Sequence, residues 1–341
     1  LSFFSTLMVS KGKIFSVLPA FTIRPCDAMD LRRTRPKPMA RVNQTSSVSE
    51  FILLGLSSRP EDQTSLFILF LTMFLVTVIR NLLIILAIHS DPQLQAPMYF
   101  FLSFLSFTDI CFTTTVVPRM LVNFLSEKTI SYAGCLTQMY FIYALGNTDS
   151  CLLVVMAFDR YVAICNPFNY VTTMPLVAFS FSLPHLHSLL HTLLLNCLVF
   201  CDSNVIHHFL CDLSPLMKLS CSPTFADEIV ILSEGSIVLV TPFLCIIFSY
   251  LQILIAVLKI PSAIGKRKAF PTCGSHLTVV ALFYGSIFYV YLQPLSTYTA
   301  RDHIATLVYT VLSSMLNPFI YSLRNRDLKQ GLKKLMGRRK S

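Results

Sequence analysis

Near its middle, the chain reads Val154-Val155-Met156-Ala157-Phe158-Asp159-Arg160-Tyr161-Val162-Ala163-Ile164-Cys165. A long apolar run ends there in an acid, a base and an aromatic residue, and further apolar residues follow. In a membrane helix such an ionic pair can lie at the edge of the bilayer, where charges cost least. The same residues can also form an ordinary interfacial Asp-Arg pair that indicates no particular fold. The rest of the chain decides between these two interpretations.

The composition of the 341 residues is that of a membrane protein. Hydrophobic residues make up 54% of the chain, charged residues only 13%, and the mean hydropathy is +0.65. A soluble domain carries about twice that share of charge. The apolar blocks are continuous and long enough to cross the hydrocarbon, which takes about 20 residues each. This pattern argues against a β-barrel, whose strands alternate in short segments.

Seven such blocks are present. They lie at 66–88, 97–120, 135–162, within 174–200, and at 229–254, 270–292 and 304–323. The fourth is uncharged apart from its histidines and is interrupted by Pro184. We therefore predict an all-α membrane protein with a seven-transmembrane helix bundle over 66–323. An extracellular N-terminus at 39–65 precedes the bundle, and a basic cytoplasmic tail at 324–341 with a short amphipathic helix follows it.

The net charge of +10 is concentrated in a few places. Lysines and arginines gather between the fifth and sixth blocks and after the seventh, and such an excess marks the cytoplasmic side. The N-terminus is then extracellular, which agrees with the glycosylation acceptor Asn43-Gln44-Thr45. Topology and lipid headgroups account for this distribution, so we expect membrane lipids and no nucleic acid as partners.

Residues 1–38 do not look like part of the bundle. They are basic, and their apolar pieces are too short to span a membrane. One interpretation is a targeting segment. The other, which we favour because residue 1 is not Met, is a disordered extension upstream of a start at Met29 or Met39.

Several motifs in order identify a family. They are Pro97–Leu102, Leu105–Asp109, Met156–Cys165, Ser249-Tyr250, Lys268-Ala269-Phe270 with Thr272–His276, and Pro318–Asn325. From about Met39 to the C-terminus, the chain resembles the olfactory receptors, which are rhodopsin-like (class A) G-protein-coupled receptors.

The resemblance implies a coupling and activation set at the cytoplasmic side. Arg160 would pair with Asp159 at rest and, once released, would present its permanently charged guanidinium to the carbonyls of a partner helix. A simple topology anchor is the alternative for this arginine. A movable kink would form in the seventh helix, where proline removes a backbone hydrogen bond. The full set is Asp159, Arg160, Tyr161, Tyr250, Asn317, Pro318 and Tyr321.

Two carboxylic acids, Asp109 and Asp149, fall inside the apolar blocks. Each costs roughly 2.5–3.5 kcal/mol on insertion scales, so we expect both to face the interior of the bundle. Facing acids repel unless a cation or a shared proton intervenes. The resemblance implies a sodium site here, although relatives usually carry Glu where Asp149 stands. A neutral hydrogen-bonded pair without metal is the alternative; we expect no other cofactor.

The cysteines of the predicted lumenal side are Cys135, Cys201, Cys211 and Cys221. Such cysteines normally pair, but spacing alone does not give the connectivity. The resemblance implies the pairs Cys135–Cys211 and Cys201–Cys221. Clustered His207, His208 and Cys211 are also compatible with a metal site.

The resemblance also places a ligand pocket among the third, fifth, sixth and seventh helices. An apolar and aromatic wall with a few polar groups suits a small volatile molecule. Some of these side chains could instead serve helix packing, and Glu234 could pair with a cationic odorant. The residues are Ile142, Tyr143, Gly146, Asn147, Glu234, Tyr284, Ile287, Phe288, Tyr291, Leu307 and Thr310.

Four features depart from the family pattern. Arg80 replaces a glycine and places a charge near the middle of the bilayer, and Pro271 replaces a serine. The segment 170–193 is several residues shorter than in the family. The chain contains no Trp, so the tryptophan usual in the fourth helix is missing. A short fourth helix kinked at Pro184 would insert poorly.

The resemblance implies an odorant receptor of the plasma membrane that activates a stimulatory, olfactory-type G protein and raises cAMP. Ligand binding would shift a two-state equilibrium without covalent chemistry. One alternative is a degenerate, non-signalling product. Another is a small-solute transporter or channel, although the internal repeats typical of transporters are missing. No nucleophile–base set or phosphate loop indicates an enzyme.

Overall fold

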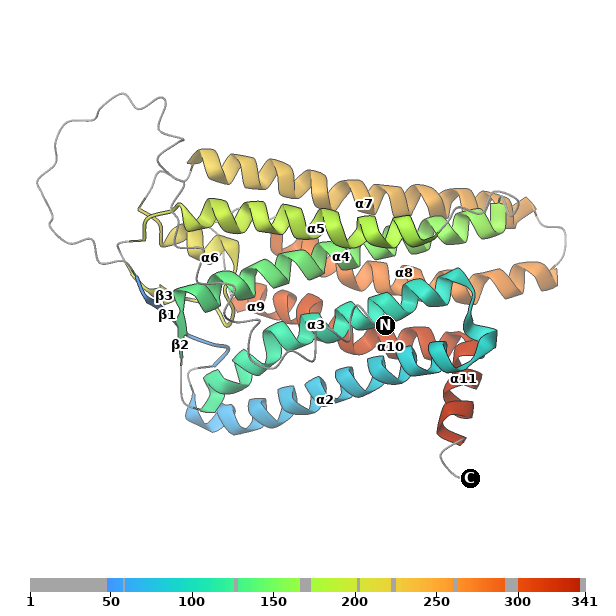
Figure 1. Cartoon of the computed structure of the whole chain (residues 1–341), viewed down its shortest axis with the longest axis horizontal. Coiled ribbons are helices and arrows are strands. Elements are labelled where there is room, and N and C mark those ends of the chain that lie inside the picture. Colours follow the sequence, from blue (N-terminus) through green and yellow to red (C-terminus); the bar gives the residue numbers. More distant parts are fainter. Residues whose placement is uncertain are drawn as a thin grey trace, which may run out of the picture.

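The computed structural model describes residues 48–57, 59–125, 128–165, 173–200, 203–221, 225–259, 263–291 and 300–337. Its long helices lie side by side as one bundle (Figure 1). The first helices are α2 (Pro60–Ser90), α3 (Pro97–Leu125), α4 (Tyr132–Cys165) and α5 (Thr173–Asn196). They are followed by α7 (Phe225–Lys259) and α8 (Ala263–Tyr291).

The last crossing is built from three consecutive segments. These are α9 (Ala300–Leu307), a π-helical segment η6 (Val308–Leu312) and α10 (Ser313–Arg324). The shorter helices are η4 (Pro92–Leu94), α6 (Leu213–Lys218) and α11 (Arg326–Gly337). The order of the long helices matches the seven predicted blocks, and a C-terminal helix is present as expected.

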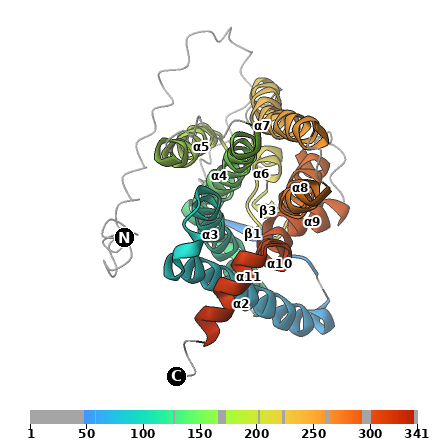
Figure 2. The same ribbon diagram turned by 90° about the vertical axis from the view of Figure 1, so that its right-hand side faces the viewer.

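Helix α4 is the centre of the bundle. It contacts α3, α5, α7 and α8, and the end-on view in Figure 2 places it between α3, α5 and α7. The buried face of each long helix contributes to one hydrophobic core that runs along the bundle. Other apolar side chains of α2, α5 and α7 remain exposed, as expected of helices that face lipid.

Six of the described helical segments are long and apolar enough to cross a membrane. They are Glu61–Ser90, Pro97–Leu125, Tyr132–Cys165, Ile237–Lys259, Cys273–Val290 and His303–Ser322. Helix α5 is not among these six, and Pro184 and the histidines His185, His187 and His191 interrupt its leucines. It nevertheless occupies the position of the predicted fourth span and packs against α4.

Pro184 lies inside a continuous helix. The segment Thr173–Asn196 is helical throughout, with Pro184 inside it. The hydroxyl of Ser188 donates to the carbonyl oxygen of Tyr140 in α4 at 2.6 Å. Ser180 and Ser188 are both buried, and small side chains of this kind let two membrane helices approach closely.

The helices extend beyond the apolar blocks. Helix α2 begins at Pro60 rather than at 66, and α8 begins at Ala263 rather than at 270. Both extensions carry polar or charged residues. An α-helix satisfies its backbone hydrogen bonds in water as well as in lipid, so hydropathy marks only the part of the helix that lies in the hydrocarbon.

A small sheet that the sequence did not reveal closes one end of the bundle. Its strands are β1 (Glu50–Leu53), β2 (Thr129–Ser131) and β3 (Val205–Ile206), in the order β2-β1-β3. Strand β1 pairs antiparallel with β2 and parallel with β3. Phe51 and Leu53 are fully buried there, which fixes the segment ahead of α2 to the bundle. We call this end the disulfide end.

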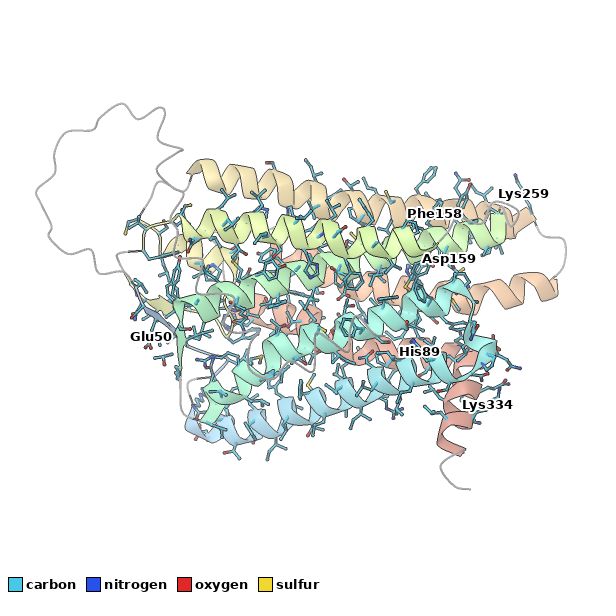
Figure 3. The ribbon with its side chains drawn as sticks, viewed as in Figure 1. Glu50, His89, Phe158, Asp159, Lys259 and Lys334 are labelled. Atoms are coloured by element: carbon cyan, nitrogen blue, oxygen red, sulfur yellow. A yellow bond between two sulfur atoms is a disulfide. The ribbon has the colours of Figure 1, made fainter. Side chains whose placement is uncertain are left out.

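Helix α11 marks the opposite end, the tail end. Figure 3 places His89, Phe158, Asp159, Lys259 and Lys334 there and Glu50 at the disulfide end. The Lys334 ammonium pairs with Asp91 at 2.9 Å. A Cβ added at Gly331 would lie 2.7 Å from Leu94 Cδ1, so α11 packs closely on η4.

Candidate functional site

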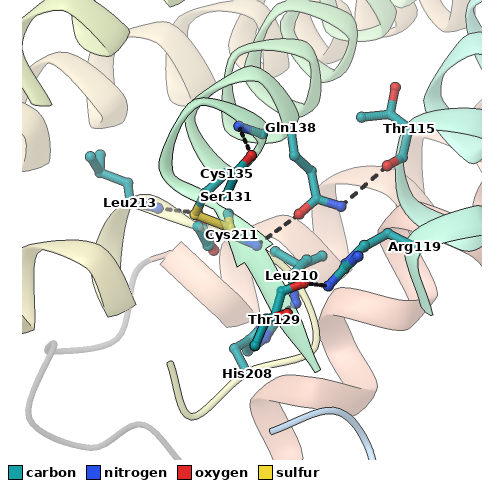
Figure 4. The surroundings of a disulfide bond; sticks show 12 residues. Thr115, Arg119, Thr129, Ser131, Cys135, Gln138, His208, Leu210, Cys211 and Leu213 are labelled. Carbon is teal, nitrogen blue, oxygen red and sulfur yellow. Dashed lines mark hydrogen bonds between the residues drawn. A yellow bond between two sulfur atoms is a disulfide. The ribbon is translucent and has the colours of Figure 1, made fainter. Parts of the chain in front are cut away.

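At the disulfide end, Cys135 in the first turn of α4 is bonded to Cys211 (Figure 4). This bond confirms the first predicted pairing, and it excludes Cys211 as a thiolate ligand of the alternative metal site. Among the described residues, no group of three or more His, Cys, Asp or Glu side chains could hold a metal ion. The second predicted pairing involves Cys201, which lies outside the described residues.

Gln138 is the polar connection around this disulfide. Its Oε1 accepts from the Cys211 amide at 3.0 Å, and its Nε2 donates to the carbonyl oxygen of Thr115 in α3 at 3.2 Å (Figure 4). One side chain thereby joins α3, α4 and the loop that carries Cys211 ahead of α6. Sequence reasoning missed it; the available signal was a lone amide one turn after Cys135 in an apolar helix.

The loop also packs against the last crossing. The buried ring of His208 stacks on Phe209 and meets the edge of the His303 ring of α9 at 4.7 Å. Leu210 donates its amide to His208 Nδ1 at 3.2 Å. Burial, together with the nearby His303, lowers the pKa of His208 to about 3. His208 is therefore neutral at physiological pH.

In the middle of the bundle, both predicted acids face the interior. Asn317 Nδ2 donates to both carboxylate oxygens of Asp109, at 3.2 and 3.1 Å. Thr108 donates its hydroxyl to Asp149. The two carboxyl groups are buried and close enough to interact electrostatically. The sequence thus predicted the location of these acids correctly.

Arg80, which departs from the family pattern, contacts an aromatic ring. Its guanidinium lies over the ring of Phe319 in α10, with 4.9 Å from Cζ to the ring centroid. The next residue, Asn81, is fully buried and donates to the carbonyl oxygen of Ser314 at 3.2 Å. The charge near the centre of α2 is therefore placed against an aromatic face, an arrangement that stabilises a cation.

Toward the tail end, three of the predicted activation residues, Arg160, Tyr250 and Tyr321, lie close together. Arg160 is half-buried, and its Nη2 is buried without a hydrogen-bond partner among the described residues. Arg160 is close enough to Tyr250 and Tyr321 to act on both electrostatically. The ring of His276 in α8 stacks on Tyr250 at 5.5 Å. His276 lies in a motif quoted above, but sequence reasoning did not single it out.

Three of the predicted pocket residues, Tyr284, Ile287 and Phe288, lie in an aromatic cluster whose other members sequence reasoning missed. Tyr284 and Ser150 share a hydrogen bond of 2.6 Å between their hydroxyl oxygens. The ring of Phe243 in α7 lies 5.2 Å from both Tyr284 and Phe288. Ile287 is buried beside them. The cluster joins α4, α7 and α8 in the core.

A second group lies between α3, α4 and the last crossing. A Cβ added at Gly146 would meet only the ring of Phe112, at 4.0 Å. That ring contacts Tyr309 at 6.3 Å. Ile142 is buried, Leu307 is half-buried, and the buried Thr310 donates its hydroxyl to the carbonyl oxygen of Thr306.

Two predicted pocket residues direct their polar atoms elsewhere. The Tyr143 hydroxyl donates to Asp212 at 2.8 Å, and the Asn147 amide lies 3.5 Å from His187 Nδ1 in α5. The backbones of Glu234 and Tyr291 lie in α7 and α8, but their side chains are outside the described part of the structure.

Comparison with known proteins extends these observations. Residues 70–339 match the sequence model of a family described as olfactory receptor. Human olfactory receptor 1L8 is 76% identical over 308 residues, which cover 88% of this chain and 100% of the relative. Human olfactory receptor 1L1 is 63% identical over 347 residues, which cover 100% of this chain and 96% of the relative.

Among solved structures, squid rhodopsin superimposes with a TM-score of 0.65 at 17% identity, covering 82% of this chain and 81% of that chain. At this identity the likeness concerns the fold alone. It confirms the predicted seven-transmembrane bundle.

Proposed function

Since the chain belongs to the olfactory receptor family, as its motifs predicted, we propose that it binds small volatile odorants and activates a stimulatory, olfactory-type G protein that raises cAMP. Members of this family are signalling receptors and not enzymes, and the chain is a multi-pass protein of the plasma membrane. The disulfide end faces outward in this proposal and the tail end faces the cytoplasm.

The convergence at Arg160 supports the coupling proposal most directly. A guanidinium carries five donors in a fixed fork, and here one of its nitrogens is buried without a partner. Leaving such a donor unsatisfied is costly, so an acceptor that enters beside Tyr250 and Tyr321 is favoured. Carbonyl groups at the C-terminus of a partner helix are acceptors of this kind.

Replacing Arg160 by Ala tests this role. The variant is compared with wild type at equal surface level, using an odorant that a panel screen has first identified with the wild-type chain. We expect ligand-stimulated cAMP to fall to the basal level while odorant binding persists. Unchanged stimulation would show that Arg160 is only a topology anchor.

The aromatic cluster supports the ligand proposal. The rings of Phe243, Tyr284 and Phe288 provide an apolar wall, and the Ser150–Tyr284 pair provides hydroxyl groups that can hydrogen-bond to an odorant oxygen. Phe288→Ala should weaken the response by about tenfold or more, whereas the same change at Phe179, which is exposed on α5, should not alter it.

The two buried acids suit a sodium ion. Asp109, Asp149 and the Thr108 hydroxyl are oxygen donors, the type that hard cations prefer. Asn317 Oδ1 is buried without a partner among the described residues, which leaves a further acceptor for a cation. We propose that these residues hold sodium, which would supply the charge that offsets the two carboxylates.

A sodium titration of the purified protein at constant ionic strength tests this idea. Sodium should raise the midpoint of thermal unfolding of the wild type, and Asp149→Asn should remove the dependence. A midpoint that does not change with sodium in the wild type would favour a shared proton between the two acids.

A further inference from the structure

The contact between α4 and α5 contains a histidine pair that the proposed receptor mechanism does not use. His187 and His191 are four residues apart, so they lie on one face of α5. Their ring centroids are 4.4 Å apart, and their Nε2 atoms are 3.0 Å apart. His191 is buried and His187 half-buried.

This geometry suits a shared metal ion. Imidazole nitrogens bind Zn²⁺ at about 2.0–2.1 Å, so two nitrogens 3.0 Å apart would subtend about 95° at a common ion. That angle is close to the right angle between neighbouring ligands in a square-planar Cu²⁺ site. Histidines four apart on one helical face are also the pair that holds zinc in helical metal sites.

Asn147 gives the pair a further feature of metal sites. A metal-ligating histidine usually engages its second ring nitrogen with a hydrogen-bond acceptor, which fixes the tautomer. The Asn147 amide lies 3.5 Å from His187 Nδ1. Amide orientation is an assignment made from the hydrogen-bond network, and with its oxygen toward the ring Asn147 would accept from Nδ1–H. The Nε2 lone pair of His187 would then face His191.

We propose that His187 and His191 form a binding site for a divalent transition-metal ion of the imidazole-preferring class, Zn²⁺ or Cu²⁺. His191 lies five residues before the end of α5 at Asn196, which corresponds to about 7.5 Å along the helix. The pair therefore lies near the disulfide end, the side from which an aqueous ion would approach it. Small ligands such as water would complete the coordination.

Copper binding to the purified full chain tests the proposal. The protein is prepared without a polyhistidine tag, and its thiols are blocked because thiolates also bind copper. Cu²⁺ alone is then titrated and its electron paramagnetic resonance spectrum is recorded. We expect one tight equivalent with hyperfine coupling to two imidazole nitrogens, displaced by excess Zn²⁺.

The variants His187→Gln and His191→Gln should each weaken Cu²⁺ binding by about tenfold or more and leave one coupled nitrogen. His185→Gln is the matched control. The His185 ring lies on the same helix, but its Nδ1 is 2.8 Å from the Phe181 carbonyl oxygen. Because His185 and His187 are two positions apart, their side chains point about 200° apart around the helix. Binding in this variant should equal that of the wild type.

A measurement on the wild type alone avoids dependence on folding of the variants. Cu²⁺ or Zn²⁺ at micromolar concentration should raise the midpoint of thermal unfolding. No stabilisation and no nitrogen coupling in the wild type would overturn the proposal. Tight binding that persists when His187→Gln and His191→Gln are combined would also overturn it. In either case the contact between the two rings would be an N–H···N hydrogen bond and not a metal site.

Discussion

At the scale of single residues, one aromatic contact lowers the expected energetic cost of the charge at Arg80. In the sequence it is a cation near the middle of a lipid-facing helix, a costly position. In the fold, its guanidinium lies 4.9 Å from the centroid of the Phe319 ring. An aromatic face within about 6 Å of a cation contributes roughly 0.5–2 kcal/mol, and more where water is excluded. Phe319 therefore offsets part of the cost.

A double-mutant cycle tests this contact. Phe319→Leu should lower thermal stability in the wild-type chain and have a smaller effect in the Arg80→Gln background, with a coupling free energy of about 0.5–2 kcal/mol. The readout is the unfolding midpoint of the purified protein in detergent. An equal effect of Phe319→Leu in both backgrounds would mean that the ring contributes only packing.

The buried His208 gives the disulfide end a pH dependence. Its pKa is about 3 in the fold, against 6.5 for an ordinary histidine. Below pH 6.5 the unfolded chain therefore binds a proton that the folded chain does not, so stability falls as the pH falls toward 3. Acidification from pH 7 to pH 5 should lower the free energy of unfolding by about 2 kcal/mol.

Thermal unfolding of His208→Phe checks this expectation, because the variant should lose that part of the pH dependence. His89→Gln is the control. His89 is exposed at the tail end, so its replacement should leave the dependence as in the wild type. A wild-type midpoint that is the same at pH 7 and pH 5 would contradict the neutral, buried state of His208.

At the scale of elements, α5 packs against α4 along a contact that includes a buried serine. Ser188→Val removes the hydrogen bond to the Tyr140 carbonyl oxygen and inserts a bulkier side chain into a buried contact. We expect a loss of about 1–2 kcal/mol and a lower surface level. Ser182, which is exposed on the same helix, provides the control substitution Ser182→Val. Equal surface levels of the two variants would show that the hydrogen bond is dispensable.

The elements also divide into those that the sequence predicts and those that it does not. Apolar blocks predict the helices because each must satisfy its backbone hydrogen bonds internally while crossing lipid. Strand β1 was missed because four residues give too short a pattern, and its pairing with β2 and β3 is non-local. The π-helical segment at Val308–Leu312 has no pattern in the sequence for a similar reason; its conformation depends on the packing around it.

At the scale of the whole molecule, family motifs name some residues of the candidate site, and the fold adds neighbours that the motifs do not name. The motifs named Arg160, Tyr250 and Tyr321, which do converge. They did not name Gln138 or Phe243, whose roles depend on neighbours that are far apart in the chain. A lone amide or phenylalanine in an apolar run has many possible partners, and only tertiary packing selects one.

The orientation of the bundle in the membrane is a property of the whole chain. Lysines and arginines gather at the tail end, and the excess of these residues favours the cytoplasmic side. The Cys135–Cys211 bond lies at the opposite end, and disulfides form in the oxidising lumen. Both physical arguments favour the proposed orientation, with the segment before α2 outside; Asn43 lies outside the described residues.

A glycosylation assay tests that orientation. The chain is expressed with an N-terminal tag, and we expect antibody staining of intact cells and a band that shifts after glycosidase treatment. The shift should disappear in Asn43→Gln and in Thr45→Ala, which both destroy the acceptor triplet, but not in Gln44→Ala, which keeps it. Staining that needs permeabilised cells, together with a mature glycan, would indicate a folded chain retained inside the cell. A second version of the chain carries its tag at the C-terminus. If that version is unglycosylated and its tag stains on intact cells, the basic end lies outside, and the charge argument is wrong for this protein.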